Sequence, residues 1–307
     1  MSRIDEALKI SEEANGIVAS EVTAVQRGPF SPLSQYGRED PDWHAHDEPA
    51  APRPLGPSEL FRPVSTARPI ATQRIKLPED ANLRARLVTA TTSAVSLEQY
   101  RKLGALLHEA QTQKQSKTVM ITSALPHEGK TLTVVNLAIT LSESYARRVL
   151  VIDADLRAPS VHTILDIPND RGLSEALQEG QHELPFTEVS SRLTVLTAGT
   201  SGPNPLAGLS SRRMGEVLEE CAARFDWVLV DTPPVGVLPD AQVLARLVGE
   251  VILVIGAGST PAAAIERAVA ELGGADAISG TVLNRVDERR IPDADYYGQY
   301  EASRRRN

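Results

Sequence analysis

Cysteine is almost absent from this sequence: Cys221 is the only one in 307 residues, so no internal disulfide can form. No cluster of His and Cys accompanies it, which excludes a structural zinc site of the usual spacing. The chain has fewer basic residues, 32, than acidic ones, 40, and its net charge of −8 gives no general attraction to nucleic acid. It also lacks an apolar run of the roughly 18 residues that span a membrane, and its start lacks the order of a secretion signal. We therefore expect a cytoplasmic protein with no nucleic-acid partner.

Proline is scarce over most of the chain but concentrated near its start, where ten of the 21 prolines lie between Pro29 and Pro78. A segment rich in Pro, Gly, Ser and charged residues cannot bury a core, so we expect residues 17–82 to be a disordered linker. Ahead of it, the apolar spacing of residues 1–16 predicts a short amphipathic helix. A helix of this length is marginal in water, so it is either frayed or folds onto a partner.

Short runs rich in Val, Ile and Leu follow residue 117, and helical segments of about 10–17 residues separate them. Continuous apolar strands alternating with helices are typical of a parallel sheet buried on both faces, so we expect one α/β domain over residues 83–286. A helix that begins at Ser96, with a capping box to Gln99, is expected near its start. The predicted strands are Val119–Ser123, Val149–Asp153, Leu193–Leu196, Trp227–Asp231, Val251–Ile255 and Gly280–Leu283.

The segment Ala124–Thr131 reads Ala-Leu-Pro-His-Glu-Gly-Lys-Thr between a predicted strand and a predicted helix. This is the pattern of a phosphate-binding loop, with alanine at the first glycine position. Such a loop needs backbone N–H groups at a helix N-terminus, a lysine to neutralise the β- and γ-phosphates, and a hydroxyl for Mg²⁺. Lys130 and Thr131 supply the last two. The alternative is an ordinary strand-to-helix turn with a surface lysine.

Acidic residues end two further predicted strands: Asp153, with Asp155 just after it, and Asp231. The carboxyl ends of parallel strands form the ligand-binding edge of an α/β sheet. The strand closing on Asp231 has the form of a Walker B element, whose carboxylate holds Mg²⁺ directly or through water. For Asp155 the alternative is a helix N-cap. Three strand ends thus converge on a predicted nucleotide and Mg²⁺ site.

Six sequence elements, taken in order, resemble those of the bacterial tyrosine kinases (BY-kinases) of exopolysaccharide and capsule biosynthesis. The resemblance covers about residues 95–300. It implies a P-loop NTPase-type parallel sheet flanked by helices, and an ATP-dependent protein tyrosine kinase that regulates polysaccharide synthesis or export. The opening Met1–Leu8 also looks like the start of stand-alone members. The elements are Ser123–Thr131, Val151–Pro159, Arg171–Leu177, Gly202–Leu206, Asp231–Val235 and Leu283–Val286.

The same resemblance implies ATP and Mg²⁺ as cofactors and assigns roles to single residues. It makes either Asp153 or Asp155 the base that accepts the tyrosine proton. The catalytic residues are then Lys130, Asp153, Asp155 and Asp231, and the metal ligands Thr131, Asp153 and Asp231. The nucleotide contacts are Pro126, His127, Glu128, Gly129, Lys130, Thr131, Leu132 and Asn284.

The last part of the chain, residues 287–307, is expected to be a flexible tail that carries Tyr296, Tyr297 and Tyr300. A charged, glycine-containing end has no core in which to bury three aromatic rings. The resemblance implies that they are phosphoacceptors, modified in trans within a homo-oligomer; an aromatic docking tail is the alternative. It also implies a separately encoded membrane chain-length regulator that recruits the kinase to the inner face of the membrane, and a cognate tyrosine phosphatase.

Two positions depart from the family pattern. His127 stands where family loops often have glycine, so a backbone angle that glycine adopts freely is either strained or different here. The family's oligomerisation helix carries Glu-x-x-Arg-x-x-Arg, and this chain has Glu98, Arg101 and Gly104. The missing second arginine is expected to weaken ring assembly.

Two other functions share parts of this pattern. A partitioning or division-site ATPase has the same fold, but it carries a lysine after the first glycine position of the loop, where this chain has Leu125. It also has a basic amphipathic C-terminal helix, which is not evident here. A nucleotide-sensing scaffold for polysaccharide assembly would keep the ATP site without transferring phosphate.

Overall fold

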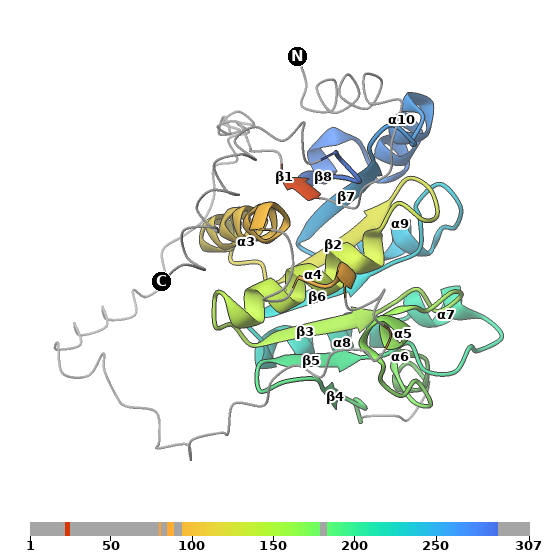
Figure 1. Cartoon of the computed structure of the whole chain (residues 1–307). Coiled ribbons are helices and arrows are strands. Elements are labelled where there is room, and N and C mark those ends of the chain that lie inside the picture. Colours follow the sequence, from red (N-terminus) through yellow and green to blue (C-terminus); the bar gives the residue numbers. More distant parts are fainter. Residues whose placement is uncertain (1–21, 25–79, 81–84, 89–93, 179–182, 288–307) are drawn as a thin grey trace, which may run out of the picture. The chain divides into compact units, whose positions relative to one another are not determined.

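The computed structural model describes residues 22–24, 80, 85–88, 94–178 and 183–287 (Figure 1). The expected helix in residues 1–16, most of the expected linker and the three tail tyrosines lie outside these residues. Within the expected linker, residues 22–24 form strand β1 (Val22–Ala24), so the linker prediction is wrong for these three residues. No helix in the described ranges combines the length and apolar character of a membrane span.

The described residues form an eight-stranded sheet whose order is β1-β8-β7-β2-β6-β3-β5-β4. All six predicted strands are confirmed, and six adjacent strands run parallel. Short antiparallel strands, β1 and β4, close its two edges. The remaining strands are β2 (Thr118–Ser123), β3 (Val149–Asp153), β4 (Thr187–Glu188), β5 (Leu193–Leu196), β6 (Trp227–Asp231), β7 (Glu250–Gly256) and β8 (Gly280–Asn284).

Helices cover both faces of this sheet, as the continuous apolar strands require (Figure 1). The longer ones are α3 (Ala94–Lys114), α4 (Lys130–Glu143), α8 (Arg212–Arg224) and α10 (Ala262–Glu271). The shorter ones are α5 (Val161–Leu165), α6 (Leu173–Ala176), α7 (Pro205–Leu209), α9 (Asp240–Ala245) and the 3₁₀ turn Ala275–Ala277. The arrangement confirms the predicted P-loop type of α/β fold.

Alternation along the strands divides the core in two. Met120 and Val230 pack into one apolar cluster with residues of α6, α8, α9 and α10. Their neighbours Ile121 and Leu229 point the other way, into a second cluster with α3, α4 and α5. Successive side chains of a strand point to opposite faces, so strands without a polar side bury both. The central strands are thereby fixed, and so are the positions of the acids at their ends.

The start of α3 differs from the prediction. The helix begins at Ala94, and Ser96 is buried within its first turn, so the predicted capping box from Ser96 to Gln99 is wrong. Val95, which precedes the expected start, is itself buried in the core. Burial of this extra apolar residue outweighs the local capping signal, because capping contributes only about 1 kcal/mol.

Gly104 of α3 faces inward, and its contacts explain why the second arginine of the family motif is missing. An added Cβ atom at Gly104 would lie 2.9 Å from Cε2 of Tyr145. The Tyr145 hydroxyl donates a hydrogen bond of 2.7 Å to the carbonyl of Arg101, which fixes the ring in this place. The first part of the motif is intact, since Arg101 and Glu98 form an ion pair at 2.5 Å. Gly104 and Tyr145 therefore belong to one packing arrangement.

Replacing Gly104 by arginine should destabilise the protein by displacing the Tyr145 ring. We expect Gly104→Arg to cost about 1–3 kcal/mol, a typical overpacking penalty, and to lower the melting temperature by roughly 2–12 °C. Gly104→Ala should cost less, because the gain in helix propensity of about 1 kcal/mol offsets the close contact. Thermal unfolding followed by circular dichroism measures both.

The matched control is the same substitution in a Tyr145→Ala background. Once the ring is gone, Gly104→Arg should cost less than it does in the natural chain. An equal cost in both backgrounds would show that Tyr145 does not determine the residue at position 104.

Candidate functional site

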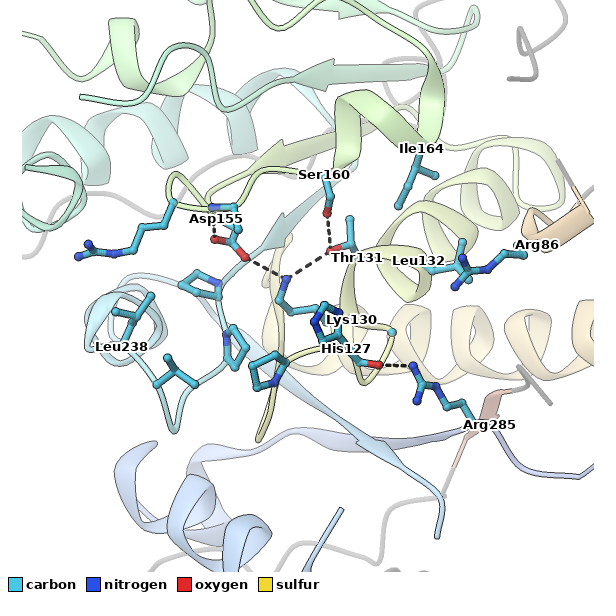
Figure 2. Close-up of a pocket in the computed structure, with 17 residues that line it drawn as sticks. Arg86, His127, Lys130, Thr131, Leu132, Asp155, Ser160, Ile164, Leu238 and Arg285 are labelled. Carbon is cyan, nitrogen blue, oxygen red and sulfur yellow. Dashed lines mark hydrogen bonds and ion pairs between the residues drawn. The ribbon is translucent and has the colours of Figure 1, made fainter. Parts of the chain in front are cut away.

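The candidate site lies at the carboxyl ends of the central strands. Residues 124–129 connect β2 to α4, and the strand register sets Asp231 beside both Asp153 and Ile121. In this sheet the chain passes from β2 to β3 on one side and from β6 to β7 on the other. Such a reversal of direction opens a crevice between the loops that follow the strands. The predicted loop and the predicted acids therefore meet in one place, and Figure 2 shows Lys130, Thr131 and Asp155 together there.

A cavity of about 500 Å³ occupies this crevice. Of the predicted nucleotide contacts, Glu128 and Asn284 do not line it, and the other six do. Asp155 lines it as well, whereas Asp153 and Asp231 are buried behind it. The lining residues are Arg86, Pro126, His127, Gly129, Lys130, Thr131, Leu132, Asp155, Arg157, Ala158, Ser160, Ile164, Pro233, Pro234, Val237, Leu238 and Arg285.

Lys130 points into the pocket and is not the surface lysine of the alternative interpretation, because only 12% of its side chain is exposed. Its ammonium forms an ion pair with Asp155 at 3.0 Å and donates to the Thr131 hydroxyl at 3.3 Å. Burial alone would lower the pKa of Lys130, but the negative charges of Asp231 and Asp155 outweigh it and raise that pKa. The lysine is therefore a fixed positive charge at the start of α4.

Asp153 shapes the loop after β3. One of its carboxylate oxygens accepts a hydrogen bond from the backbone N–H of Asp155 at 3.2 Å. The other accepts from the N–H groups of Ser160 and Val161, both at 3.1 Å. Burial and the negative charge of Asp231 raise the pKa of Asp153 to about 8. Three of its roughly four acceptor positions hold the chain that carries Asp155.

Asp155 is presented to the pocket by that loop. One oxygen of the Asp155 carboxylate is paired with Lys130. The other accepts from the N–H of Ala158 at 3.1 Å, which closes a turn. The following helix, α5, begins only at Val161 after Ser160, so the alternative in which Asp155 is the N-cap of that helix is wrong. Asp155 thus combines a turn-closing bond with the ion pair to Lys130, and it lines the pocket although only 5% of its side chain is exposed.

Asp231 is the least compensated group of the site. It is fully buried, and neither of its carboxylate oxygens has a hydrogen-bond partner among the described residues. Burial raises the pKa of Asp231 to about 6, against the opposing effects of Lys130 and the nearby Thr131 hydroxyl. The Thr131 oxygen also accepts from the Ser160 hydroxyl at 3.2 Å. A carboxylate without donors beside a hydroxyl is a donor set that suits Mg²⁺.

The residues that the structure describes do not supply a complete metal cage. Within the described ranges, no three His, Cys, Asp or Glu side chains are arranged to hold a metal ion. Mg²⁺ rarely needs such a cage, because it keeps several waters and binds through one or two carboxylates together with substrate phosphates. Asp231 and Thr131 therefore fit Mg²⁺ only together with a phosphate ligand.

The loop is held from beneath by contacts that the sequence did not reveal. The buried carboxylate of Glu128 accepts from the N–H of Leu125 at 2.7 Å and from the Thr260 hydroxyl, and burial raises its pKa. Asn284 donates through its side-chain amide to the carbonyl of Glu128 at 2.8 Å. Both residues fasten the loop to β7, β8 and the turn before α10. A direct nucleotide contact for Glu128 or Asn284 stays a prediction.

Two residues of the loop adopt left-handed backbone angles. His127 has φ 64°, so the family's usual glycine is replaced here without a change to the right-handed region. The guanidinium of Arg285 donates to the carbonyl of His127 and secures this turn. Gly129 has φ 92°, and an added Cβ would lie 2.0 Å from Nδ2 of Asn284. The angle and the lack of space together require glycine at position 129.

Two of the family-like elements lie outside the pocket and support the framework. In Arg171–Leu177, the Glu175 carboxylate accepts from the N–H groups of Gly172 at 2.7 Å and Thr200 at 3.1 Å. In the other element, Asn204 caps α7 by accepting from the N–H of Ala207. These motifs position the segment after β5 and take no part in the pocket.

Comparison with known proteins agrees with this geometry. Residues 119–300 match the CobQ/CobB/MinD/ParA nucleotide binding domain. Over 218 residues the chain is 37% identical to tyrosine-protein kinase YwqD of Bacillus subtilis, covering 69% of this chain and 92% of that protein. It is 36% identical over 200 residues to tyrosine-protein kinase Etk of Escherichia coli, covering 63% of this chain and 27% of Etk. The solved kinase domain of Escherichia coli ETK matches at 35% identity with a TM-score of 0.60, covering 64% of this chain and 78% of that domain.

Replacing Asp231 by asparagine should stabilise the ligand-free protein while removing Mg²⁺-dependent ATP binding. The substitution removes a buried charge without hydrogen-bond partners, for which we expect a gain on the order of 1–2 kcal/mol in the free energy of unfolding. Because its pKa is raised in the folded state to about 6, Asp231 costs stability as the pH rises from about 4 to 6. The gain should therefore appear in chemical denaturation at pH 7.5 and vanish near pH 4.

Asp226→Asn is the control, because its expected effect on stability has the opposite sign. Burial would raise the pKa of Asp226, but hydrogen bonds from the backbone and guanidinium of Arg148 lower it overall. This substitution should destabilise the protein at pH 7.5. If Asp231→Asn also destabilised the ligand-free protein at that pH, or retained natural ATP·Mg²⁺ affinity in calorimetry, the interpretation of Asp231 would be wrong.

Proposed function

Since the chain belongs to the CobQ/CobB/MinD/ParA nucleotide-binding family, and within it to the bacterial tyrosine kinases, we propose that this pocket transfers the γ-phosphoryl group of ATP to tyrosine. The observation that carries the proposal is the pairing of Lys130 with Asp155 in a pocket backed by Asp231, whose carboxylate has no hydrogen-bond partner among the described residues. A lysine at a helix N-terminus beside a carboxylate that lacks donors fits a phosphate chain with its metal ion.

Different residues of the pocket bind the phosphates and the metal ion. Lys130 and the backbone N–H groups of the loop bind and orient the phosphates. Thr131 and Asp231 would hold Mg²⁺, which supplies neutralisation of phosphate charge when bound. Phosphoryl transfer depends mainly on such positioning and electrostatic stabilisation.

We assign the base to Asp155 rather than to Asp153. Asp155 lines the pocket, whereas Asp153 does not line it and accepts three backbone N–H groups. A tyrosine hydroxyl entering the pocket can reach the first carboxylate but not the second. Asp153 then acts by positioning, since it holds the loop that carries Asp155, and it takes no metal in this assignment.

The acceptors that we propose are Tyr296, Tyr297 and Tyr300. They begin ten residues after Val286, and an extended chain of that length reaches about 33 Å. Such a tail can enter the pocket of a neighbouring copy in a homo-oligomer. Each phosphate adds about −1.5 to −2 charges beside three acidic tail residues, so repulsion from the carboxylates of Asp153, Asp155 and Asp231 should favour release of the modified tail.

Because the motifs of this chain resemble those of the BY-kinases of exopolysaccharide and capsule biosynthesis, we place this cycle in the control of capsule or exopolysaccharide synthesis. We propose further that a separately encoded membrane chain-length regulator recruits the kinase to the inner face of the membrane. A cognate tyrosine phosphatase would reset the tail. Co-purification with a membrane protein encoded nearby tests this part independently of the chemistry.

Lys130→Met should abolish phosphotyrosine formation while leaving the fold intact, because it removes the fixed positive charge for the phosphates. The measurement is anti-phosphotyrosine detection after incubation with ATP and Mg²⁺, with circular dichroism to check folding. Arg212→Met is the control, since the Arg212 side chain is 93% exposed on α8 and lies outside the pocket. Full activity in the Lys130 variant would contradict the assignment of this pocket as the ATP site. The absence of phosphotyrosine in the natural protein would favour a positioning ATPase or a nucleotide-sensing scaffold.

Changing Tyr296, Tyr297 and Tyr300 together to phenylalanine should remove most autophosphorylation and leave ATP binding unchanged. The tail supplies acceptors and no part of the nucleotide pocket, so the two measurements should separate. Mass spectrometry of the natural protein should find phosphate on these tyrosines. Phosphate mainly on Tyr36, Tyr100 or Tyr145 would contradict the assignment.

A further inference from the structure

Arg86 lines the pocket from a segment that belongs to none of the recognised motifs. We propose that its guanidinium binds the α-phosphate end of the nucleotide, an inference that rests on the proposed ATP site. Three observations carry it: the lack of a partner for this arginine among the described residues, the rigid attachment of its backbone to α4, and its place along the pocket.

The other cations of the pocket already have partners. Lys130 is paired with Asp155, and Arg157 is paired with the buried Asp240 at 2.7 Å. The guanidinium of Arg285 donates to the carbonyl of His127. By contrast, the Arg86 guanidinium makes no ion pair or hydrogen bond within the described residues, although an arginine carries five donors in a fixed planar fork. An anion in the pocket would be its natural partner, because the fork matches phosphate oxygens in a bidentate manner.

The backbone of Arg86 is held firmly in spite of the exposed side chain. The next two residues, Leu87 and Val88, are buried in the core under α4. Asn136 clamps this segment with both ends of its amide: it accepts from the N–H of Val88 at 2.8 Å and donates to the carbonyl of Arg86 at 3.0 Å. Asn136 lies six residues after Lys130 on the same helix. The position of Arg86 is therefore fixed relative to the helix end that holds the phosphates.

The place of Arg86 along the pocket indicates which phosphate it meets. Figure 2 shows Arg86 and Leu132 on one side of Lys130, and Asp155 and Leu238 on the other. In a phosphate-binding loop the lysine reaches the β- and γ-phosphates, while backbone N–H groups around the helix start cradle the α- and β-phosphates. Asp155 marks the γ end, because it pairs with Lys130 and is the proposed base. Arg86 is then at the opposite, α end of the chain.

The test is nucleotide binding by Arg86→Ala, measured by calorimetry with ATP and with ADP in the presence of Mg²⁺. Both ligands carry the α-phosphate, so both should bind about 10- to 100-fold more weakly, the loss expected for a charge-assisted hydrogen-bonded contact. Arg86→Lys, which keeps the charge but not the fork, should recover part of the affinity. Arg212→Ala is the matched control: it removes the same charge from a side chain that is 93% exposed on α8 and lies outside the pocket, and it should bind as the natural protein does.

Three results would overturn the proposal. Unchanged affinity of Arg86→Ala for both nucleotides would show that the guanidinium does not touch the nucleotide. A loss confined to ATP would move the contact to the γ end. Unchanged nucleotide affinity with a raised KM for an acidic tyrosine peptide would assign Arg86 to the acceptor. Failure of the natural protein to bind ATP would instead remove the proposed function itself, so the two failures are distinguishable.

Discussion

Crowding of negative charge around a single lysine is the constraint on which the site depends. Lys130 faces Asp155 directly, and its pKa also responds to Asp153 and Asp231. One ammonium cannot compensate three carboxylates in a buried environment, so the pKa values of Asp153 and Asp231 rise. Without ligand, this arrangement is relieved only by proton uptake. A metal ion bound together with a nucleotide would compensate the excess negative charge. The pocket is therefore better suited to a nucleotide with its metal ion than to water.

The framework keeps these charges together because each is attached to a rigid element. The strand register places Asp153 opposite Asp231, and the two apolar cores leave no freedom to slip by one residue. The loop itself is held by two hydrogen bonds. The Glu128 carboxylate accepts from the hydroxyl of Thr260, which precedes α10, and the Glu128 carbonyl accepts from the amide of Asn284, which ends β8. Packing throughout the domain therefore offsets the unfavourable free energy of holding these carboxylates close together.

Much of this arrangement could be predicted from the sequence, and the rest could not for identifiable reasons. The strands were predictable because they are unbroken apolar runs, and Lys130, Asp155 and Asp231 because they follow such runs. The bond between Glu128 and Thr260 joins residues 132 positions apart, and no local pattern encodes such a pair. Arg86 stands in a stretch without periodicity, so its place on the pocket wall could not be predicted. In the structure its backbone is held by Asn136. The start of α3 was misplaced because burial of Val95 outweighed a local capping preference.

Strand β1 gives the N-terminal extension a protective role. It pairs antiparallel with β8, from Val22 opposite Asn284 to Ala24 opposite Val282. Without it, β8 would present a row of free N–H and C=O groups beside apolar side chains, and bare edges of this kind promote pairing between molecules. A chain that begins at residue 83 would keep the catalytic machinery but expose this edge. Its first defect would then be aggregation at high concentration, even where each isolated molecule folds and turns over normally.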